Sequence, residues 1–199
     1  PSEISILIKE HFNRWYSLKP YVISVTVTDI PVLTICCLLF TTITYLMTGQ
    51  PLEVHRALMF AVISILVVLV AQSFGLLVGS SFNVVNGTFV GLSMSVPILL
   101  LAGFGETLKD LPINMYWASY MSYMKYGFEG LMAAIYGLDR QIIHCPDGEY
   151  CHYRNPKKFI RDMLIHADQF WTDILGLCII FMVLRIMAFI VLKFKITRG

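Results

Sequence analysis

The side chains best suited to chemistry lie in one short stretch, HCPDGEYCH, from His144 to His152. Thiols and imidazoles are ligands that zinc accepts, so His144, Cys145, Cys151 and His152 form a candidate zinc site. The two thiols can instead form a disulfide bond, which persists in an oxidising compartment. Cys145 and Cys151 are not spaced as a CxxC knuckle, so the choice depends on which side of a membrane the stretch occupies.

Two charged residues, Asp29 and Arg185, stand inside long apolar runs. Ionisable side chains are expensive within a membrane and are functional candidates by default. Asp29 lies near the Lys19 end of its run, which favours a structural role. Arg185 lies about two helical turns before Lys193, and we expect it to snorkel towards the lipid headgroups. The alternative is an ion pair inside the protein, with Asp29 a better partner than Glu129.

Motifs for hydrolysis are missing from the sequence, which contains no GxxxxGK[ST], HExxH or GxSxG pattern. We therefore predict no catalytic residue in this chain. A content of 57% hydrophobic and 14% charged residues, with a mean hydropathy of +0.70, excludes an ordinary water-soluble domain. The net charge of +2 and the lack of a basic stripe give no support to nucleic-acid binding. The chain is predicted to be an all-α membrane protein.

Four apolar runs, 21–47, 57–79, 87–105 and 171–192, are predicted to cross the membrane. A hydrocarbon core of about 30 Å needs about 20 residues. Lysines and arginines flank the first and last runs, which places both ends of the chain in the cytoplasm. An even number of crossings follows, so the aromatic segment 111–138 should turn back at the outer face. The loop 139–170 then lies outside, where a Cys145–Cys151 disulfide is favoured over zinc.

Small residues recur at every fourth position in the second and third runs. This spacing lets two helix backbones approach closely in lipid, so we predict that the two runs pack together. Pro97 removes a backbone donor and is expected to kink the third run. A helix that lines a path and a simple helix contact are equally supported by this run alone. The predicted packing positions are Gly87, Gly91 and Ser95 in the third run, and Ala71, Gly75 and Gly79 in the second.

Residues 1–19 form an amphipathic segment with a period of 3.6 residues. It is predicted to be an interfacial helix that either contacts a cytoplasmic partner or anchors the chain at the membrane surface. The segment has no initiator methionine or signal peptide, so we expect the C-terminal part of a longer protein. The expected divisions are 1–19, 20–105 with three spans, 106–138 at the outer face, the loop 139–170, and 171–199 with the last span.

Four runs carry a resemblance: EHFNRWYSLKPY at 10–21, AQSFGLLVGS at 71–80, SYMKYGFEGLMAAIYGLDR at 122–140 and FKITRG at 194–199. Within the third run, YGFEG followed by IYGLDR is much more specific than hydropathy. Together the four runs resemble the transmembrane half of the G-subfamily, White-type ABC half-transporters, most of all the sterol-exporting branch. The resemblance covers essentially the whole chain. It implies an ABC-2 type exporter fold with four spans, an amphipathic coupling helix and an outer pair of re-entrant helices, and it matches Cys145 and Cys151 to an extracellular disulfide loop.

The resemblance also assigns roles to individual positions. The coupling helix, with Lys9, Glu10 and Arg14, would rest on a nucleotide-binding domain of the same polypeptide, which binds ATP and Mg²⁺ and is absent from this chain together with the first two spans. The third run would line the substrate cavity on a dimer axis. Its substrate positions are Val96, Leu99 and Leu100, and its outer valve is Phe104 with Gly105.

The implied function is ATP-driven export of sterol or a related lipid across the plasma or endosomal membrane. The exporter would be a homodimer, or a heterodimer with a related half-transporter. One alternative is an exporter of small aromatic metabolites such as pigment precursors, which would need more hydrogen-bonding groups in the cavity. The other is a structural membrane subunit without transport activity.

Overall fold

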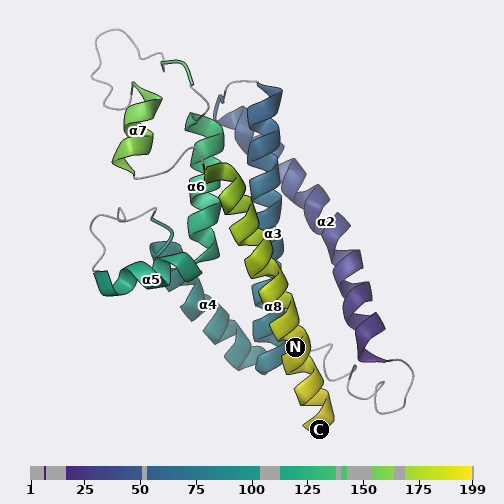
Figure 1. Ribbon diagram of the computed structural model, residues 1–199. Coiled ribbons are helices and arrows are strands. Elements are labelled where there is room, and N and C mark those ends of the chain that lie inside the picture. The colour runs from purple at the N-terminus through teal and green to yellow at the C-terminus, as the bar shows by residue number, and fades with distance from the viewer. Residues whose placement is uncertain are drawn as a thin grey trace.

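The computed structural model describes residue 7 and residues 17–50, 53–103, 113–137, 140–142, 154–163 and 169–198. Seven α-helices run through these ranges (Figure 1), which confirms the predicted all-α class. They are α2 (Leu18–Met47), α3 (Val54–Ser81), α4 (Val84–Leu100), α5 (Ile113–Met121), α6 (Tyr123–Tyr136), α7 (Pro156–Asp162) and α8 (Phe170–Arg198).

Three of these helices, α2, α3 and α8, are long and apolar enough to cross a membrane. The protein is therefore a multi-pass membrane protein. The third predicted run corresponds to α4, which is apolar but has only 17 residues. At 1.5 Å per residue α4 is about 26 Å long, slightly short of the hydrocarbon core. The predicted valve residues Phe104 and Gly105 lie outside the described residues.

Threonines are frequent in α2, and their hydroxyl groups are satisfied within the helix. Thr26, Thr34 and Thr44, for example, each donate to the carbonyl four residues earlier, over 2.8, 2.7 and 2.8 Å. In lipid there is no water to take such donors, so this local bonding is what allows a threonine-rich helix to face the hydrocarbon. Gly49 ends the helix with a φ of 63°, a conformation that glycine adopts without strain.

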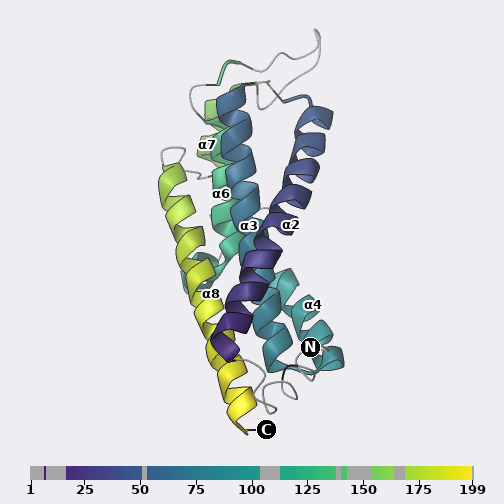
Figure 2. The same ribbon diagram turned by 90° about the vertical axis from the view of Figure 1, so that its right-hand side faces the viewer.

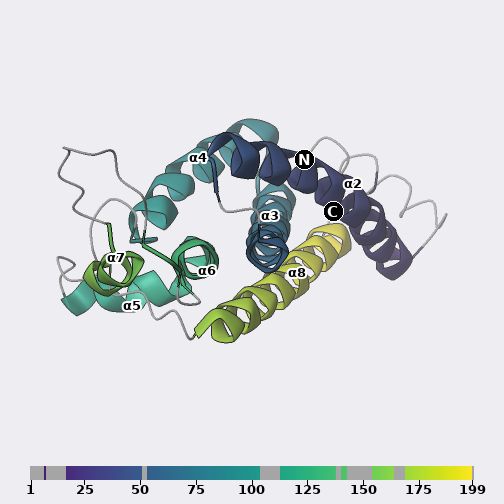
Figure 3. The same ribbon diagram turned by 90° about the horizontal axis from the view of Figure 1, so that it is seen from above.

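The helix α3 lies at the centre of the bundle, with α2, α4, α6 and α8 around it (Figure 3). The buried core consists of Ile63 and Val70 from α3 with Phe170 and Leu177 from α8. The start of α2 and the end of α8 lie at the same end of the bundle (Figures 1 and 2).

Two short helices, α5 and α6, occupy the segment that was predicted not to cross. The helix α6 has 14 residues, or about 21 Å, which is too short to span the hydrocarbon core. Two hydroxyl groups bind the end of α4: Ser119 of α5 donates to the Leu101 carbonyl over 3.2 Å, and Ser122, just before α6, donates to the Ile98 carbonyl over 2.8 Å. These serines satisfy carbonyls that the end of a helix leaves unpaired.

Glycines of α6 make the closest contact with α3. A Cβ atom on Gly127 would lie 2.6 Å from Val67 Cγ2, and one on Gly130 would lie 2.8 Å from Ile63 Cδ1. The other end of α6 is held by Arg56, whose Nη1 donates to the carbonyls of Ala134, Ile135 and Gly137. The cation thus caps the carbonyl end of the helix, where the dipole favours positive charge.

Candidate functional site

A network of polar side chains joins α2, α3 and α8 inside the membrane part. Arg185 of α8 donates from Nε to Ser73 Oγ over 3.0 Å, from Nη1 to Thr26 Oγ1 over 3.0 Å and from Nη2 to Gln72 Oε1 over 2.8 Å. Gln72 in turn donates from Nε2 to Asp29 Oδ2. A single guanidinium group therefore links three helices, because its donors point in several fixed directions.

These hydrogen bonds correct the prediction that Arg185 snorkels towards the headgroups. The guanidinium is half-buried and points inward, where hydroxyl and amide oxygens accept three of its hydrogen bonds. Satisfying the donors in this way lowers the penalty of removing the charge from water. Asp29 is the acidic member, as the alternative proposed, but it reaches Arg185 through Gln72 rather than in a direct ion pair.

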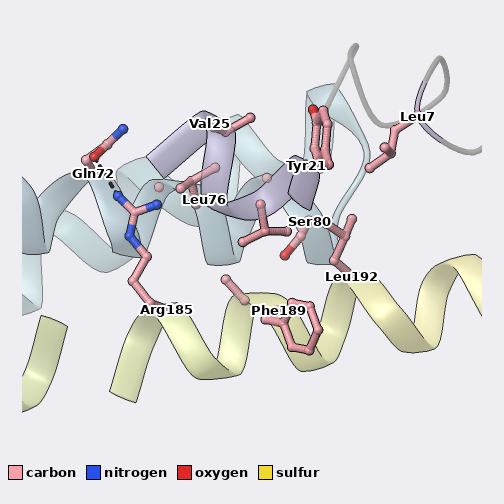
Figure 4. A pocket seen from close by; sticks show the side chains of 13 residues that line it. Leu7, Tyr21, Val25, Gln72, Leu76, Ser80, Arg185, Phe189 and Leu192 are labelled. Atoms are coloured by element: carbon pink, nitrogen blue, oxygen red, sulfur yellow. Dashed lines mark hydrogen bonds between the residues drawn. The ribbon is translucent and has the colours of Figure 1, made fainter. Parts of the chain in front are cut away.

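A cavity of about 400 Å³ lies next to this network, between α2, α3 and α8. Figure 4 shows Arg185 and Gln72 at one end, Leu7 and Leu192 at the other, and apolar side chains such as Leu76 and Phe189 between them. A volume of this size with mainly apolar walls and a few fixed polar groups is typical of sites for small amphipathic molecules.

The predicted substrate positions lie on the outward face of α4. Val96, Leu99 and Leu100 are 58, 52 and 58% exposed. The helix carries no charged residue between Val84 and Leu100. The three side chains therefore form an apolar surface that a lipid or a second protein can cover.

The small-residue faces of α3 and α4 both line a second cavity of about 340 Å³, which on α3 extends from Ala71 to Gly79. A Cβ atom on Gly87 would lie 3.6 Å from Phe82 Cβ and 3.9 Å from Val78 Cγ1, which is ordinary contact. A Cβ atom on Gly75 or Gly91 would meet nothing within 4 Å. The predicted close approach is therefore limited to the Gly87 end. Ala71, Gly79 and Ser95 also line this cavity.

Tyr123 of α6 lies on the wall of the same cavity. Burial raises the pKa of its phenol further above physiological pH, where the group is neutral in any case and can donate a hydrogen bond.

Leu7 is the one described residue of the predicted coupling helix before Ser17. Its side chain is buried against Leu18 at the start of α2 and Leu192 near the end of α8. This contact ties the N-terminal segment to two of the membrane helices. Lys9, Glu10 and Arg14 lie outside the described residues, and so do Cys145 and Cys151 with their two histidines. Within the described ranges no group of His, Cys, Asp or Glu side chains is placed to hold a metal ion.

Sequence reasoning missed the role of Gln72 and the glycines of α6. Gln72 is an uncharged residue in an apolar run, and nothing local distinguishes it from a simple polar interruption. Gly127 and Gly130 did indicate a close helix contact, because two glycines three positions apart lie on one helix face.

Comparison with known proteins agrees with this architecture. The family model described as ABC-2 type transporter matches residues 1–136. The chain therefore belongs to the ABC-2 type transporter family of membrane domains.

Three relatives place it more closely within that family. The chain is 30% identical to ABC transporter G family member 21 of Arabidopsis thaliana, 26% to Protein white of Drosophila melanogaster and 28% to ABC transporter G family member 1 of Dictyostelium discoideum. The matches cover 97, 99 and 98% of this chain but only 28, 29 and 26% of the relatives. The chain is the membrane domain of a G-family, White-type ABC transporter, and it spans less than a third of the length of these relatives.

Proposed function

We propose that this membrane domain exports sterol or a related lipid as part of a dimeric, ATP-driven half-transporter. The observation that carries the proposal is the outward face of α4, where Val96, Leu99 and Leu100 form an uncharged, apolar wall. A wall of this kind binds its cargo by burying apolar surface rather than by hydrogen bonds. Flat, mainly apolar lipids suit it better than small polar metabolites do.

The proposed dimer places two α4 faces opposite each other, with the cargo between them. Here α4 crosses the membrane in addition to α2, α3 and α8, and α5 with α6 lies at the outer side above it. Phe104 and Gly105 then form the exit on the shared axis. The partner is a second copy of the chain or a related half-transporter.

The driving force in this proposal comes from ATP and Mg²⁺ bound to a nucleotide-binding domain of the same polypeptide. The N-terminal segment, including Lys9, Glu10 and Arg14, rests on that domain in the cytoplasm. Leu7 offers the route inward, because it is packed against both Leu18 and Leu192. A shift of the segment would therefore move α2 and α8 together. The Arg185 network joins the same two helices to α3, so α3 would follow.

Further parts of the proposal concern the outer loop and the location. Cys145 and Cys151 form a disulfide in the loop 139–170, which faces the exterior. Both ends of the chain face the cytoplasm, in the plasma membrane or an endosomal membrane.

The test is efflux of radiolabelled cholesterol by the full-length protein in vesicles, with phosphatidylcholine and a small aromatic amine as competing cargoes. Leu99→Glu should abolish sterol export while dimers persist on size-exclusion chromatography. Ile179→Glu is the matched control, because Ile179 is 62% exposed on α8, away from the proposed axis. Undiminished efflux by Leu99→Glu would refute the assignment of α4. Preferred export of the amine would favour the aromatic-metabolite alternative, and ATPase activity without any cargo stimulation would favour a structural subunit.

A further inference from the structure

The cavity between α2, α3 and α8 has a distribution of charge that the export proposal does not use. Its Arg185 end is occupied by the polar network, in which Thr26, Ser73 and Gln72 accept hydrogen bonds from the guanidinium. Leu7 and Leu192 line its other end, where they pack with Leu18 in a buried cluster. Between the two ends the walls are largely apolar (Figure 4).

Two lysines stand at the leucine end of this cavity. Lys19 directly follows Leu18, and Lys193 directly follows Leu192, so both lie at the level of the leucine cluster. Both side chains are exposed, and neither has a hydrogen bond or ion pair with another described residue. Lys195 differs, because its ammonium donates to the Ser80 carbonyl at the end of α3 over 3.0 Å.

Acidic residues that would neutralise this end are missing from the three helices that line the cavity. No Asp or Glu occurs between Lys19 and Thr28 in α2, from Ser73 to the end of α3, or after Asp173 in α8. The described part of this end therefore presents positive charge next to an apolar cavity. An anion attached to a hydrocarbon chain has the complementary pattern.

We propose that this cavity binds one acyl chain of an anionic phospholipid, whose phosphate lies between Lys19 and Lys193. The acyl chain extends towards Arg185, whose guanidinium is already hydrogen-bonded to Thr26, Ser73 and Gln72. From Leu192 to Arg185 the cavity extends over about 10 Å along α8, enough for part of an acyl chain. Lysines next to a membrane helix attract anionic headgroups at about 1 kcal/mol each, roughly fivefold in affinity.

The occupied site would place a lipid against α2, α3 and α8 at once. Because these helices also carry the Arg185 network, the bound lipid would stabilise their mutual packing. The proposal is separate from export, since the site lies inside one protomer and not on the outward face of α4. Its test is therefore a binding measurement that does not depend on transport.

The experiment titrates the delipidated, detergent-purified full-length protein with dioleoyl phosphatidylserine or dioleoyl phosphatidylcholine and counts bound lipids by native mass spectrometry. We expect phosphatidylserine to bind one tight site per chain and phosphatidylcholine to bind far more weakly. The double variant Lys19→Gln with Lys193→Gln should weaken phosphatidylserine roughly thirtyfold at low salt, as expected for two lysines. Lys158→Gln is the control, because Lys158 is an exposed lysine of α7 at the opposite end of the molecule.

A second pair of variants tests the cavity itself. Ala188→Phe places a ring in the cavity that Ala188 lines and should remove the tight site, whereas Ile179→Phe on the exposed side of α8 should leave it unchanged. As a measurement without any variant, phosphatidylserine with a diazirine on its acyl chain should label peptides that contain Tyr21 or Phe189. Equal affinity for the two lipids, an unchanged affinity after both lysines are replaced, or labelling confined to other helices would overturn the proposal.

Discussion

Two contacts of α3 use glycines at helical spacing, and they differ in how closely the helices approach. On one side, Gly127 and Gly130 of α6 leave less than 3 Å between a would-be Cβ atom and the side chains of α3. On the other side, Gly75 of α3 and Gly91 of α4 face open space, and a cavity of about 340 Å³ lies between the helices. The glycines of α6 permit close packing against α3, whereas Gly75 and Gly91 leave an open space between α3 and α4.

This difference indicates which parts of the domain are fixed and which can move. The α3, α6 and α8 contact includes the buried residues Ile63, Val70 and Leu177, and no Cβ atom fits at Gly127 or Gly130 without a shift of α3 side chains. The seam, meaning the interface between α3 and α4 from Ala71 to Ser95, is in close contact only at Gly87 and elsewhere borders the cavity. Moving α4 into that space would leave the contacts of α3 with α6 and α8 in place, but Ser119 and Ser122, which bind the end of α4, would have to follow it. If the domain exports by shrinking its cavity, as proposed, α4 is the helix best placed to move.

The largest expected effect is a substitution on the tight side. Gly127→Val puts a branched side chain where a Cβ atom alone would lie 2.6 Å from Val67 Cγ2. Overpacking of this kind destabilises by about 1–3 kcal/mol. Thermal unfolding of the purified full-length protein, followed by size-exclusion chromatography, should show a clear loss of stability. The same substitution at Gly91 should not, and equal losses at both positions would remove the distinction between the two contacts.

The second effect concerns the network that joins α2 and α8 to the tight core. Arg185→Met removes three hydrogen bonds from a charged donor, so the side-chain oxygens of Gln72, Ser73 and Thr26 lose the group that donates to them. We expect a loss of about 2 kcal/mol, towards the lower end for charged hydrogen bonds because the group is only half-buried.

A double-mutant cycle with Asp29→Asn measures the charge coupling through Gln72. The double variant should lose less stability than the sum of the losses in the two single variants. Each single variant leaves one charge without its partner, whereas the double variant removes both charges. Strict additivity in thermal unfolding would show that Asp29 and Arg185 are independent.

A smaller effect is expected at the end of α6. Arg56→Met removes the donors to the carbonyls of Ala134, Ile135 and Gly137, and about 1 kcal/mol of stability should be lost. The loss should be local, so hydrogen exchange should quicken in the last turn of α6 before it changes in α3. Glu53→Gln is the control. Glu53 is bonded to Arg56 over 2.6 Å but its side chain is 61% exposed, so it should contribute little.

The smallest effect is expected at the open seam. Gly75→Ala and Gly91→Ala each place a methyl group in unoccupied space, and alanine is the better helix former by about 0.5–1 kcal/mol. Stability should therefore be unchanged or slightly higher. If α4 moves towards α3 during transport, Gly91→Leu should slow export without loss of stability, and full export by that variant would count against such a movement.

Much of the fold could be predicted because the hydropathy of a local run of residues is enough to locate a membrane helix. The hydropathy of 21–47, 57–79 and 171–192 located α2, α3 and α8, and the aromatic segment 111–138 contains the short helices α5 and α6. The boundaries predicted for α4, residues 87 and 105, were less accurate. It starts at Val84, three residues before the predicted run, and ends at Leu100, before a turn in which Gly103 takes a φ of 82°. The apolar run of the sequence continues beyond that turn, and hydropathy alone does not register it.

The sequence by itself determined the class of protein, the helices and the family, since each of these depends on composition, periodicity or short runs of residues. Only the tertiary structure decided which small residues touch and where Arg185 points. Its partners Ser73 and Gln72 are 112 and 113 positions away in the chain, and such pairings arise from helix packing rather than local preference. The physical reason is that lipid gives a polar group no alternative partner, so the nearest oxygen on a neighbouring helix takes its hydrogen bond.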